Sequence, residues 1–408
     1  MNILYICHRF PYPPKRGGKI RPFNMIRHWH QAGHHVHVAS LARSKQEAEE
    51  ARGIAEHCSG YDLAVVGATR QWARMVVRLP TLDPSSMGYF YSPELAAAIR
   101  RRLAERRWDL IFVHCSSVAQ YVDHVRDVPK ILDFGDMDSQ KWLEYANYKP
   151  ALVSFGYRLE GHKMMAAEKR LARRFDLCTA TTRAEWQTLE SYGTGVATDW
   201  FPNGVDGSFF RPTDGAYDPE AISFIGRMDY YPNQECMVRF CREIWPLLKR
   251  QRVGMKLVII GADPSPEIKA LARLPGVSVT GSVPDVRSYV RSSALMVAPL
   301  AIARGTQNKI LEAMAMGVPV VTSSAAAGGV DAEAGRHLLV AEGAEEIASA
   351  IIRVIEQPAE RARLAVAGRE RVLSHHAWHR SMRRLDGIVE RCRSMIGQQQ
   401  VATVGRAT

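Results

Sequence analysis

The chain has 408 residues, of which 46% are hydrophobic and 24% are charged, the balance of an ordinary globular protein. This length allows two domains, each with its own core. The formal net charge is +12 at pH 7, and the basic excess is spread over both halves of the sequence. An even spread argues against a dedicated nucleic-acid domain. It fits a protein that handles anionic ligands or works beside an acidic membrane surface.

Three further properties of the sequence bear on its compartment. No apolar run approaches the roughly 20 residues needed to span a bilayer. The N-terminus, Met1–Ile6, starts directly as a strand, without a basic segment and a cleavage site. The seven cysteines are scattered and never paired as C-x-x-C, which favours buried thiols in a reducing compartment over disulfides or zinc. We therefore expect a cytoplasmic protein.

The first half of the chain alternates strands with helices. An apolar strand at residues 3–6, a loop rich in Pro and Gly at residues 8–19, a helix and a strand at residues 36–39 form a β-α-β unit, the opening of a doubly wound sheet. Gly17 and Gly18 fall in the first strand-to-helix turn, where glycine lets the backbone approach a ligand, although a plain turn explains them equally. The G-x-G-x-x-G pattern of dinucleotide binding is absent, so NAD is not inferred.

Polar residues follow two later strands, at the sheet edge where such folds bind ligands. His114 directly follows the strand at residues 110–113. Its ring could act as a proton shuttle or bind the acceptor, or it could simply be hydrogen-bonded by a neighbouring residue. Asp133, Asp136 and Asp138 follow the strand at residues 130–132. They could bind a divalent metal, but capping of the next helix is the better explanation for Asp136 and Asp138. A long basic helix is expected at residues 152–175, with either a solvated face or a membrane-contacting one.

Turn residues at 201–206 and a polar segment at 211–219 mark a domain boundary. Strands and helices then alternate again, which predicts a second doubly wound sheet. Arg227 leaves the first strand of this half and suits bidentate phosphate contact, with pairing to a carboxylate as the alternative. An amphipathic segment at residues 376–395 is expected to pack across the two domains, and the last residues are expected to fray.

The segment from Ala303 to Val321 carries the most informative pattern of the second half. A loop through Arg304, Gly305 and Thr306 enters a helix, with Thr306 as the expected N-cap. Backbone N–H groups at a helix start, with Asn308 and Lys309 in the first turn, suit a phosphate. Glu312, one turn on, could accept hydrogen bonds from ribose hydroxyls. The alternative is a solvated ion pair between Lys309 and Glu312.

Four stretches of the sequence resemble the family 4 glycosyltransferases of GT-B fold. The first is P-P-K-R-G-G at residues 13–18, taken together with G-H-H-V-H-V at residues 33–38. The other three are F-P-N-G-V-D at residues 201–206, F-I-G-R-M-D-Y-Y-P-N at residues 224–233 and N-K-I-L-E-A-M-A-M-G-V-P-V-V at residues 308–321. A looser match, F-G-D-M-D-S-Q-K-W-L-E-Y-A at residues 134–146, resembles the transferases of exopolysaccharide synthesis associated with PEP-CTERM/exosortase systems.

The resemblance implies two Rossmann-like domains facing across a cleft, with a C-terminal helix crossing back to the N-terminal one. The implied divisions are an acceptor-binding domain at 1–205, a nucleotide-sugar-binding domain at 206–375, a crossover helix at 376–395 and a disordered tail at 396–408. It implies transfer of a sugar from a nucleotide-diphosphate sugar, UDP or GDP type, to a lipid-linked glycan acceptor. The transfer would be retaining and independent of metal and cofactors, and contact with the cytoplasmic membrane face is possible.

The implied site has a donor side and an acceptor side. Glu312 matches the ribose-binding glutamate, and the other donor-side positions are Gly17, Gly18, Arg227, Arg304, Gly305, Thr306, Asn308 and Lys309. His114 would lie near the transferred sugar, and Asp136 and Asp138 on the acceptor side. The chain departs from the family at Arg304, where a second glutamate usually contacts the sugar, so Arg304 could bind phosphate or an acidic sugar instead.

Three other functions compete with this interpretation of the sequence. A nucleotide-sugar epimerase would use the same architecture. A non-catalytic partner subunit of a glycan-assembly complex would keep the fold without turnover, with Arg304 as a sign of the loss. A nucleic-acid binder ranks last, because no basic cluster is interleaved with stacking aromatics.

Overall fold

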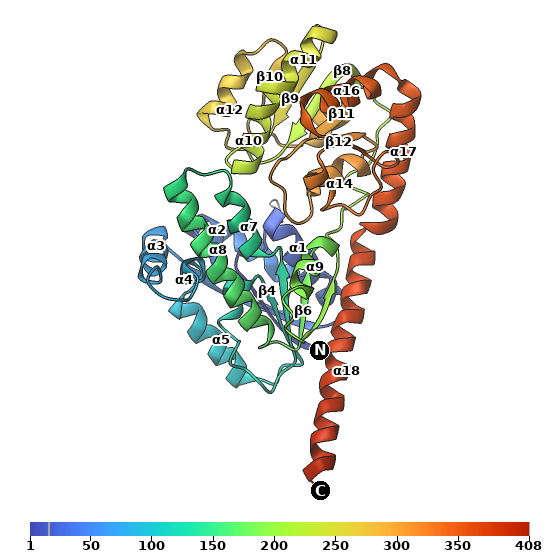
Figure 1. The fold of residues 1–408 in the computed structure, drawn as a ribbon. Coiled ribbons are helices and arrows are strands. Elements are labelled where there is room, and N and C mark those ends of the chain that lie inside the picture. Colours follow the sequence, from blue (N-terminus) through green and yellow to red (C-terminus); the bar gives the residue numbers. More distant parts are fainter. Residues whose placement is uncertain (15–16, 408) are drawn as a thin grey trace. The chain divides into compact units, whose positions relative to one another are not determined.

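A parallel sheet covered by helices lies at the centre of each of two units in the computed structural model (Figure 1). Unit 1 comprises residues 1–202 together with Met382–Thr408, and unit 2 comprises Asn203–Ser381. The structure describes residues 1–14 and 17–407, with side chains described as far as residue 397. The α/β class and the two doubly wound sheets expected from the sequence are confirmed.

The sheet of unit 1 has the strand order β3-β2-β1-β4-β5-β6-β7, and every pairing between the described strands is parallel. Short apolar runs such as Leu110–Val113 are buried on both faces, as a doubly wound sheet requires. The strands are β1 (Asn2–Cys7), β2 (His35–Ala42), β3 (Gly60–Val65), β4 (Leu110–His114), β5 (Lys130–Gly135), β6 (Leu177–Ala180) and β7 (Ala197–Trp200).

Helices cover the sheet of unit 1 and join its strands. They are α1 (Gly17–Gln31), α2 (Lys45–Glu50), η1 (Ala51–Glu56), α3 (Ala68–Val77), α4 (Ser85–Tyr89), α5 (Pro93–Glu105), α6 (Ser116–Ala119), α7 (Asp138–Ala146), α8 (Ala151–Ala172) and α9 (Arg183–Glu190). One local expectation is wrong. Gly17 and Gly18 were expected in the turn before the first helix, and they instead form the first turn of α1.

Unit 2 repeats the pattern with the strand order β10-β9-β8-β11-β12-β13, again parallel. Its strands are β8 (Asp218–Ile225), β9 (Lys256–Ile260), β10 (Val277–Val279), β11 (Ser293–Ala298), β12 (Val320–Thr322) and β13 (Leu339–Val340). Its helices are α10 (Tyr231–Arg239), η2 (Phe240–Ile244), α11 (Trp245–Gln251), α12 (Pro266–Ala270), η3 (Leu271–Arg273), α13 (Arg287–Arg291), α14 (Asn308–Ala315), α15 (Ser324–Ala327), α16 (Gly343–Glu356) and α17 (Pro358–His375).

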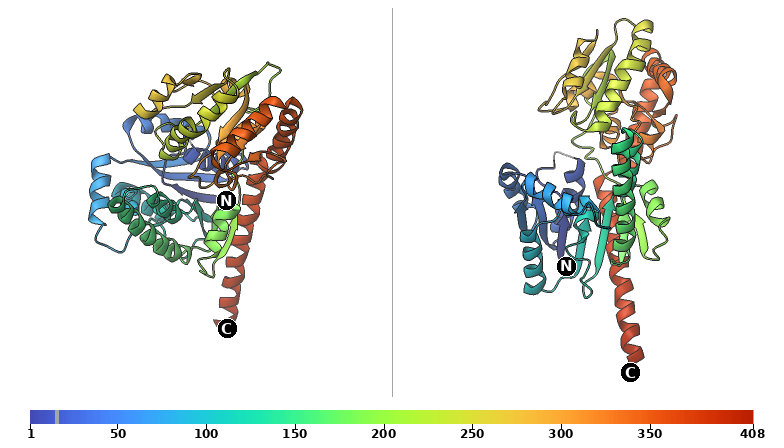
Figure 2. Two further views of the ribbon diagram at one scale, coloured as in Figure 1. Left: turned by 45° about the horizontal axis from the view of Figure 1, so that its top comes forward. Right: turned by 60° about the vertical axis from the view of Figure 1, so that its left-hand side comes forward.

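The last helix, α18 (Trp378–Ala407), returns the chain to unit 1 (Figure 2). Asp386 accepts a hydrogen bond from Trp29 Nε1 at 3.3 Å and bonds His28 Nε2 at 2.8 Å. Arg384 and Arg391 both pair with Asp199, at 2.9 and 3.0 Å. Polar contacts therefore fix α18 onto unit 1. The backbone of residues 396–407 belongs to this helix, and the disorder expected for that tail stays a prediction.

The turn that links the units packs against the end of unit 2. The backbone N–H of Val205 donates to the His376 carbonyl at 2.7 Å, and His376 Nδ1 bonds the Asn203 carbonyl at 3.2 Å. A Cβ atom on Gly204 would lie 2.6 Å from the Trp378 ring, so only glycine fits there. This packing assigns residues 203–205 to unit 2, whereas the sequence placed the boundary after residue 205.

Candidate functional site

In unit 2, two loops leave the carboxyl ends of neighbouring strands. One follows β8 and contains Arg227, and the other follows β11 and contains Arg304, Gly305 and Thr306 before α14 begins. Because β8 and β11 are adjacent and parallel, both loops emerge at the same edge of the sheet. That edge is where doubly wound sheets bind ligands.

Lys309, in the first turn of α14, connects these two loops. Its Nζ atom donates a hydrogen bond to Asn233 Oδ1 at 2.6 Å and lies 4.4 Å from the centre of the Phe224 ring. Asn233 in turn donates from Nδ2 to the Arg227 carbonyl at 2.8 Å. Burial lowers the pKa of Lys309 to about 8. Asn233 stands at the end of the loop motif at residues 224–233 but was not among the predicted site residues.

Glu312 follows one turn later on the same helix and is half-buried. Burial raises the pKa of Glu312 to about 7, and the nearby charge of Lys309 acts in the opposite direction. The alternative was an ion pair between Lys309 and Glu312, and the described residues do not form it. Lys309 donates to Asn233 instead. At about pH 7 the Glu312 carboxyl group is therefore partly ionised, and it can accept hydrogen bonds from uncharged donors.

Arg227 is engaged by carboxylates. Its Nε and Nη2 atoms contact Asp229 at 2.9 and 2.5 Å, and Nη2 also contacts Asp263 at 2.6 Å. The alternative weighed for this residue, pairing with a carboxylate, is therefore what the structure shows. About a third of the Arg227 side chain remains exposed, at 34%.

The entry of α14 differs from expectation at Thr306. The N-cap residue is Gln307, whose side chain caps no backbone N–H, and the buried Oγ1 of Thr306 has no hydrogen-bond partner among the described residues. Gln307 instead donates from Nε2 to the Arg304 carbonyl at 3.1 Å. Asn308 Oδ1 accepts from Asn203 Nδ2 at 3.2 Å, which ties the linker motif to this helix start. The first turn of α14 thus lacks a side-chain cap and suits an anion.

Two glycines that were not predicted from the sequence allow close backbone approach in and beside these loops. A Cβ atom on Gly329 would lie 2.0 Å from the Gly305 carbonyl oxygen, and one on Gly261 would lie 1.6 Å from the Gly226 carbonyl oxygen. Gly261 also has a φ of 154°, and Gly305 a φ of 60°. Only glycine allows such close backbone approach. The pair Gly328-Gly329 was a signal in the sequence.

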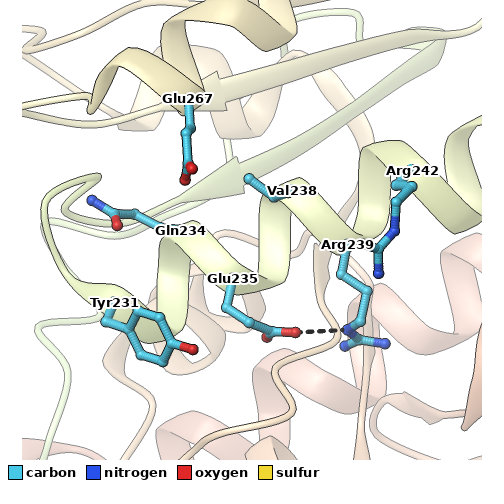
Figure 3. Close-up of a pocket in the computed structure, with 7 residues that line it drawn as sticks. All are labelled: Tyr231, Gln234, Glu235, Val238, Arg239, Arg242 and Glu267. Atoms are coloured by element: carbon cyan, nitrogen blue, oxygen red, sulfur yellow. Dashed lines mark ion pairs between the residues drawn. The ribbon is translucent and has the colours of Figure 1, made fainter. Parts of the chain in front are cut away.

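A pocket of about 180 Å³ lies along α10, directly after the Arg227 loop (Figure 3). Its walls are Tyr231, Gln234, Glu235, Val238, Arg239, Arg242 and Glu267. Glu235 and Arg239 form an ion pair at 3.2 Å, and Gln234 donates to the Met228 carbonyl at 2.8 Å. None of the residues predicted for the site lines this pocket.

In unit 1, His114 belongs to a buried network at the ends of β4 and β5. Its Nδ1 atom bonds Asp133 Oδ2 at 2.8 Å, and Arg21 grips both oxygens of the same carboxylate at 2.9 and 3.1 Å. Thr179 Oγ1 donates to Asp133 at 3.0 Å. These partners hold the pKa of the fully buried Asp133 well below its usual range, against the effect of burial.

The carboxylate of Asp133 fixes the orientation of His114, because it accepts a hydrogen bond from the Nδ1–H group and leaves Nε2 unused in this bond. His114 is thus satisfied by a neighbour, one of the three explanations weighed for it, and its role as a proton shuttle or an acceptor-binding group stays a prediction. His8, which follows β1, has its ring centre 6.0 Å from that of His114. Burial lowers the pKa of His8. Neither His8 nor Arg21 was predicted from the sequence, since neither stands in a recognisable motif.

Asp136 and Asp138 do not cap α7, contrary to expectation. The N-cap residue is Met137, and carboxylates from other helices bind the helix start. The Met137 N–H donates to Glu185 at 2.8 Å, and the Ser139 N–H donates to Glu168 at 2.9 Å. Asp136 is exposed, and Asp138 accepts a hydrogen bond from Ser116 Oγ at 3.1 Å. Among the described residues there is no cluster of side chains that could hold a metal ion.

Two family models match successive parts of the sequence. The model described as Glycosyltransferase Family 4 matches residues 16–209, and the model described as Glycosyl transferases group 1 matches residues 219–357. The chain is a glycosyltransferase. Membership of the PEP-CTERM-associated subgroup stays a prediction, and no curated protein matches this glycosyltransferase.

Solved structures show that this glycosyltransferase has the GT-B fold. Sucrose-phosphate synthase from Thermosynechococcus elongatus aligns with a TM-score of 0.72 at 16% identity, over 97% of this chain and 100% of the other. HepE of Anabaena, in complex with UDP, aligns with 0.68 at 15% identity, over 96% and 100%. A variant of S. aureus TarM, in complex with Fondaparinux, alpha-GlcNAc-glycerol and UDP, aligns with 0.65 at 10% identity, over 95% and 100%.

Proposed function

We propose that the glycosyltransferase moves a sugar from a nucleoside-diphosphate sugar, of the UDP or GDP type, to a lipid-linked glycan acceptor in exopolysaccharide or cell-surface polysaccharide synthesis. The start of α14 is the observation that carries this proposal. It combines uncapped backbone N–H groups, the ammonium of Lys309 and the carboxylate of Glu312 within one turn, at the ligand-binding edge of the sheet. A diphosphate can bind to such N–H groups and a cation, and ribose hydroxyls can donate to such a carboxylate.

Each donor-side residue has a role in this proposal. Lys309 and the N–H groups of α14 bind the diphosphate, and Glu312 accepts hydrogen bonds from the ribose. Gly305 and Thr306 shape the loop, and Asn308 anchors it through Asn203. Arg227 contacts phosphate only after it exchanges Asp229 or Asp263 for the ligand. Arg304 contacts the sugar or its phosphate, and it is the position at which donor selection is decided.

The chemistry follows from charge. As the nucleoside diphosphate leaves, negative charge grows on its oxygen atoms, and fixed cations and backbone N–H groups stabilise that charge without a metal. The sugar passes through an oxocarbenium-like state. We assign His114 to the transferred sugar and Gly17 and Gly18 of α1 to the phosphates, as the family resemblance implies. Asp136 and Asp138 belong to the acceptor side, and transfer retains the anomeric configuration.

Four solved structures of two proteins with the same fold support a nucleotide donor. The HepE structures contain UDP, UDP with glucose, or UDP-glucose, and the TarM complex contains UDP. Calorimetric titration with UDP, GDP and ADP tests the proposal on this chain. A bound nucleotide and donor-dependent transfer to a glycan acceptor support it. Absence of any nucleotide binding contradicts it, and conversion of a nucleotide sugar to its epimer without an acceptor would favour the epimerase.

Nucleotide binding should take up protons at about pH 8.5. In the free protein the pKa of Lys309 is lowered to about 8, so half or more of its ammonium groups are deprotonated there. A bound diphosphate favours the charged form and raises this pKa. Titrations in two buffers of different ionisation enthalpy measure the uptake. Lys309→Met should abolish it and weaken binding roughly 10- to 100-fold, the loss expected for a charge-assisted hydrogen bond.

The matched control for this measurement is Lys269→Met, which removes an exposed lysine of the same unit. It should leave both affinity and proton uptake unchanged. Undiminished proton uptake in Lys309→Met would show that another group titrates, and Lys309 would lose its role.

His114→Ala should lower kcat roughly 100-fold while leaving nucleotide affinity unchanged, since the proposal assigns His114 to the sugar and not to the nucleotide. His124→Ala, a control with a 62% exposed side chain in the same unit, should transfer sugar at the wild-type rate. Transfer rates and calorimetric affinities separate the two quantities. A His114 variant with normal kcat would reduce this residue to a structural role.

A further inference from the structure

Large apolar side chains are exposed on two segments of unit 1. One segment comprises α3 and the loop after it, and the other runs from the end of α7 through the first half of α8. Their exposed apolar residues are Trp72, Val76, Val77, Leu79, Leu82, Tyr148, Leu152, Val153, Phe155 and Leu159. Leu82 is 90% exposed and Leu152 is 86% exposed. Isolated exposed leucines are ordinary, but a gathering of this kind marks an interaction site.

The two segments lie side by side. Leu152, Phe155 and Leu159 share one stripe of α8, since they recur at helical spacing. Lys163 and Arg170 continue that stripe, and both reach the other segment. Lys163 Nζ donates to the Leu79 carbonyl at 2.7 Å, and Arg170 pairs with Asp83 at 2.8 Å. The right-hand view of Figure 2 brings this side of the unit forward. We call these ten residues with their flanking cations the α3–α8 surface.

The α3–α8 surface is a fixed part of the fold. Glu160, which is buried, accepts hydrogen bonds from the backbone N–H groups of Ser85 and Ser86 at 3.0 and 2.8 Å. Arg74 donates to the Tyr91 carbonyl at 2.7 Å. These bonds hold the chain after α3 against α8, so the exposed side chains are presented on a framework and not on a loose tail.

The charges around this surface are almost all positive. Residues 68–83 and 147–163 carry six Lys or Arg, at 70, 74, 78, 149, 158 and 163, against the two acidic residues Asp83 and Glu160. Asp83 pairs with Arg170 and Glu160 is buried, so neither carboxylate makes this part of the surface negative. Apolar side chains that include a tryptophan, bordered by Lys and Arg, match the boundary between acyl chains and anionic headgroups.

We propose that the α3–α8 surface docks this chain onto an anionic phospholipid membrane, with its apolar side chains at the acyl boundary and its cations on the headgroups. A second copy of the chain fits this surface less well, because it would bring like charges together. The proposal does not rest on the donor site, since every residue that carries it lies in unit 1, outside the predicted donor residues. A lipid-linked acceptor would reach the enzyme at such a surface.

Sedimentation of the full chain with phospholipid vesicles tests the proposal. Vesicles of phosphatidylcholine with phosphatidylglycerol should bind the protein, and vesicles of phosphatidylcholine alone should bind it far more weakly. The double variant Leu152→Ser/Phe155→Ser should reduce binding at least roughly tenfold, because two large side chains no longer enter the lipid. Val253→Ser/Val366→Ser is the matched control, with exposed apolar residues of unit 2, at 78% and 59%, and should bind as wild type does.

Added salt should weaken binding, since the headgroup interaction is screened. The Leu152→Ser/Phe155→Ser variant should keep wild-type nucleotide affinity, which shows that its fold is intact. The proposal is overturned if the mixed vesicles do not bind, or if the variant and the control lose binding equally. It is also overturned if ultracentrifugation shows a dimer that only the Leu152→Ser/Phe155→Ser variant dissociates, because the surface then binds a second copy.

Discussion

Glu312→Gln is expected to weaken nucleotide binding by roughly two orders of magnitude, the largest effect of any single change in the donor site. A carboxylate that accepts two hydroxyl hydrogen bonds contributes about 1.5–3 kcal/mol for each of them. The amide keeps the shape of the side chain but exchanges one acceptor for a donor that cannot pair with both hydroxyls. Calorimetric titration with the preferred nucleotide measures the loss.

The same variant should also change the proton balance and the stability. Because the pKa of Glu312 is raised to about 7, ribose binding to its charged form should release protons at about pH 6.5. Because the pKa of Glu312 is raised in the folded state, ionisation of this carboxyl group lowers the free energy of unfolding as the pH rises through about 7. Glu312→Gln should therefore be more stable than wild type at about pH 8. Donor affinity should therefore peak between the pKa of Glu312 and that of Lys309.

Glu345→Gln provides the control, as an exposed glutamate at the start of another helix in unit 2. It should bind nucleotide as wild type does and leave the proton release unchanged. A Glu312→Gln protein that is more stable at high pH yet binds nucleotide normally would remove Glu312 from the ribose site.

Asp133→Asn is expected to cause the largest loss of stability, about 3–5 kcal/mol of the free energy of unfolding. The substitution leaves the buried guanidinium of Arg21 without its counter-charge, and Arg21 is only 3% exposed. It also removes the carboxylate that orients His114. Urea denaturation measures the stability loss, and a fall in kcat with unchanged nucleotide affinity measures the loss of orientation.

Asp83→Asn is the matched control, since it breaks an ion pair in which both side chains are 52% exposed. It should cost at most about 1 kcal/mol. The pKa of Asp133 is lowered in the folded state, so its contribution to stability is present above about pH 4, the ordinary range of an aspartate, and is lost as the pH falls further. In Asp133→Asn the free energy of unfolding should fall less steeply below about pH 4 than in wild type. Equal losses of stability in Asp133→Asn and Asp83→Asn would contradict a stabilising role for the buried network.

The fold could be predicted from the sequence because its signals are local. Apolar runs such as Leu110–Val113, bounded by polar loops, sufficed to place strands, and their alternation with helices sufficed for two doubly wound sheets. Helix starts were less predictable. Carboxylates distant in the sequence, Glu185 and Glu168, bind the start of α7, and no local pattern announces them.

The candidate site was predictable in position more than in detail. The loop and helix of residues 303–321 do follow the carboxyl end of β11, as the alternation of strands and helices predicts, and ligand binding there stays a prediction. The partners of each side chain depend on tertiary contacts. Arg227 pairs with Asp263, and Lys309 pairs with Asn233, across separations of 36 and 76 residues in the sequence. The same holds for Arg21 and Asp133, 112 residues apart.

The return of α18 to unit 1 has a consequence for how the chain is made. Unit 1 is discontinuous in sequence, and Trp29 and His28 meet their partner Asp386 only after nearly the whole chain has left the ribosome. Unit 2 is one continuous segment, so it can fold completely during synthesis before α18 covers its face of unit 1. The second unit to emerge should therefore be the first to be complete, and a fragment that ends before Met382 should leave that face uncovered.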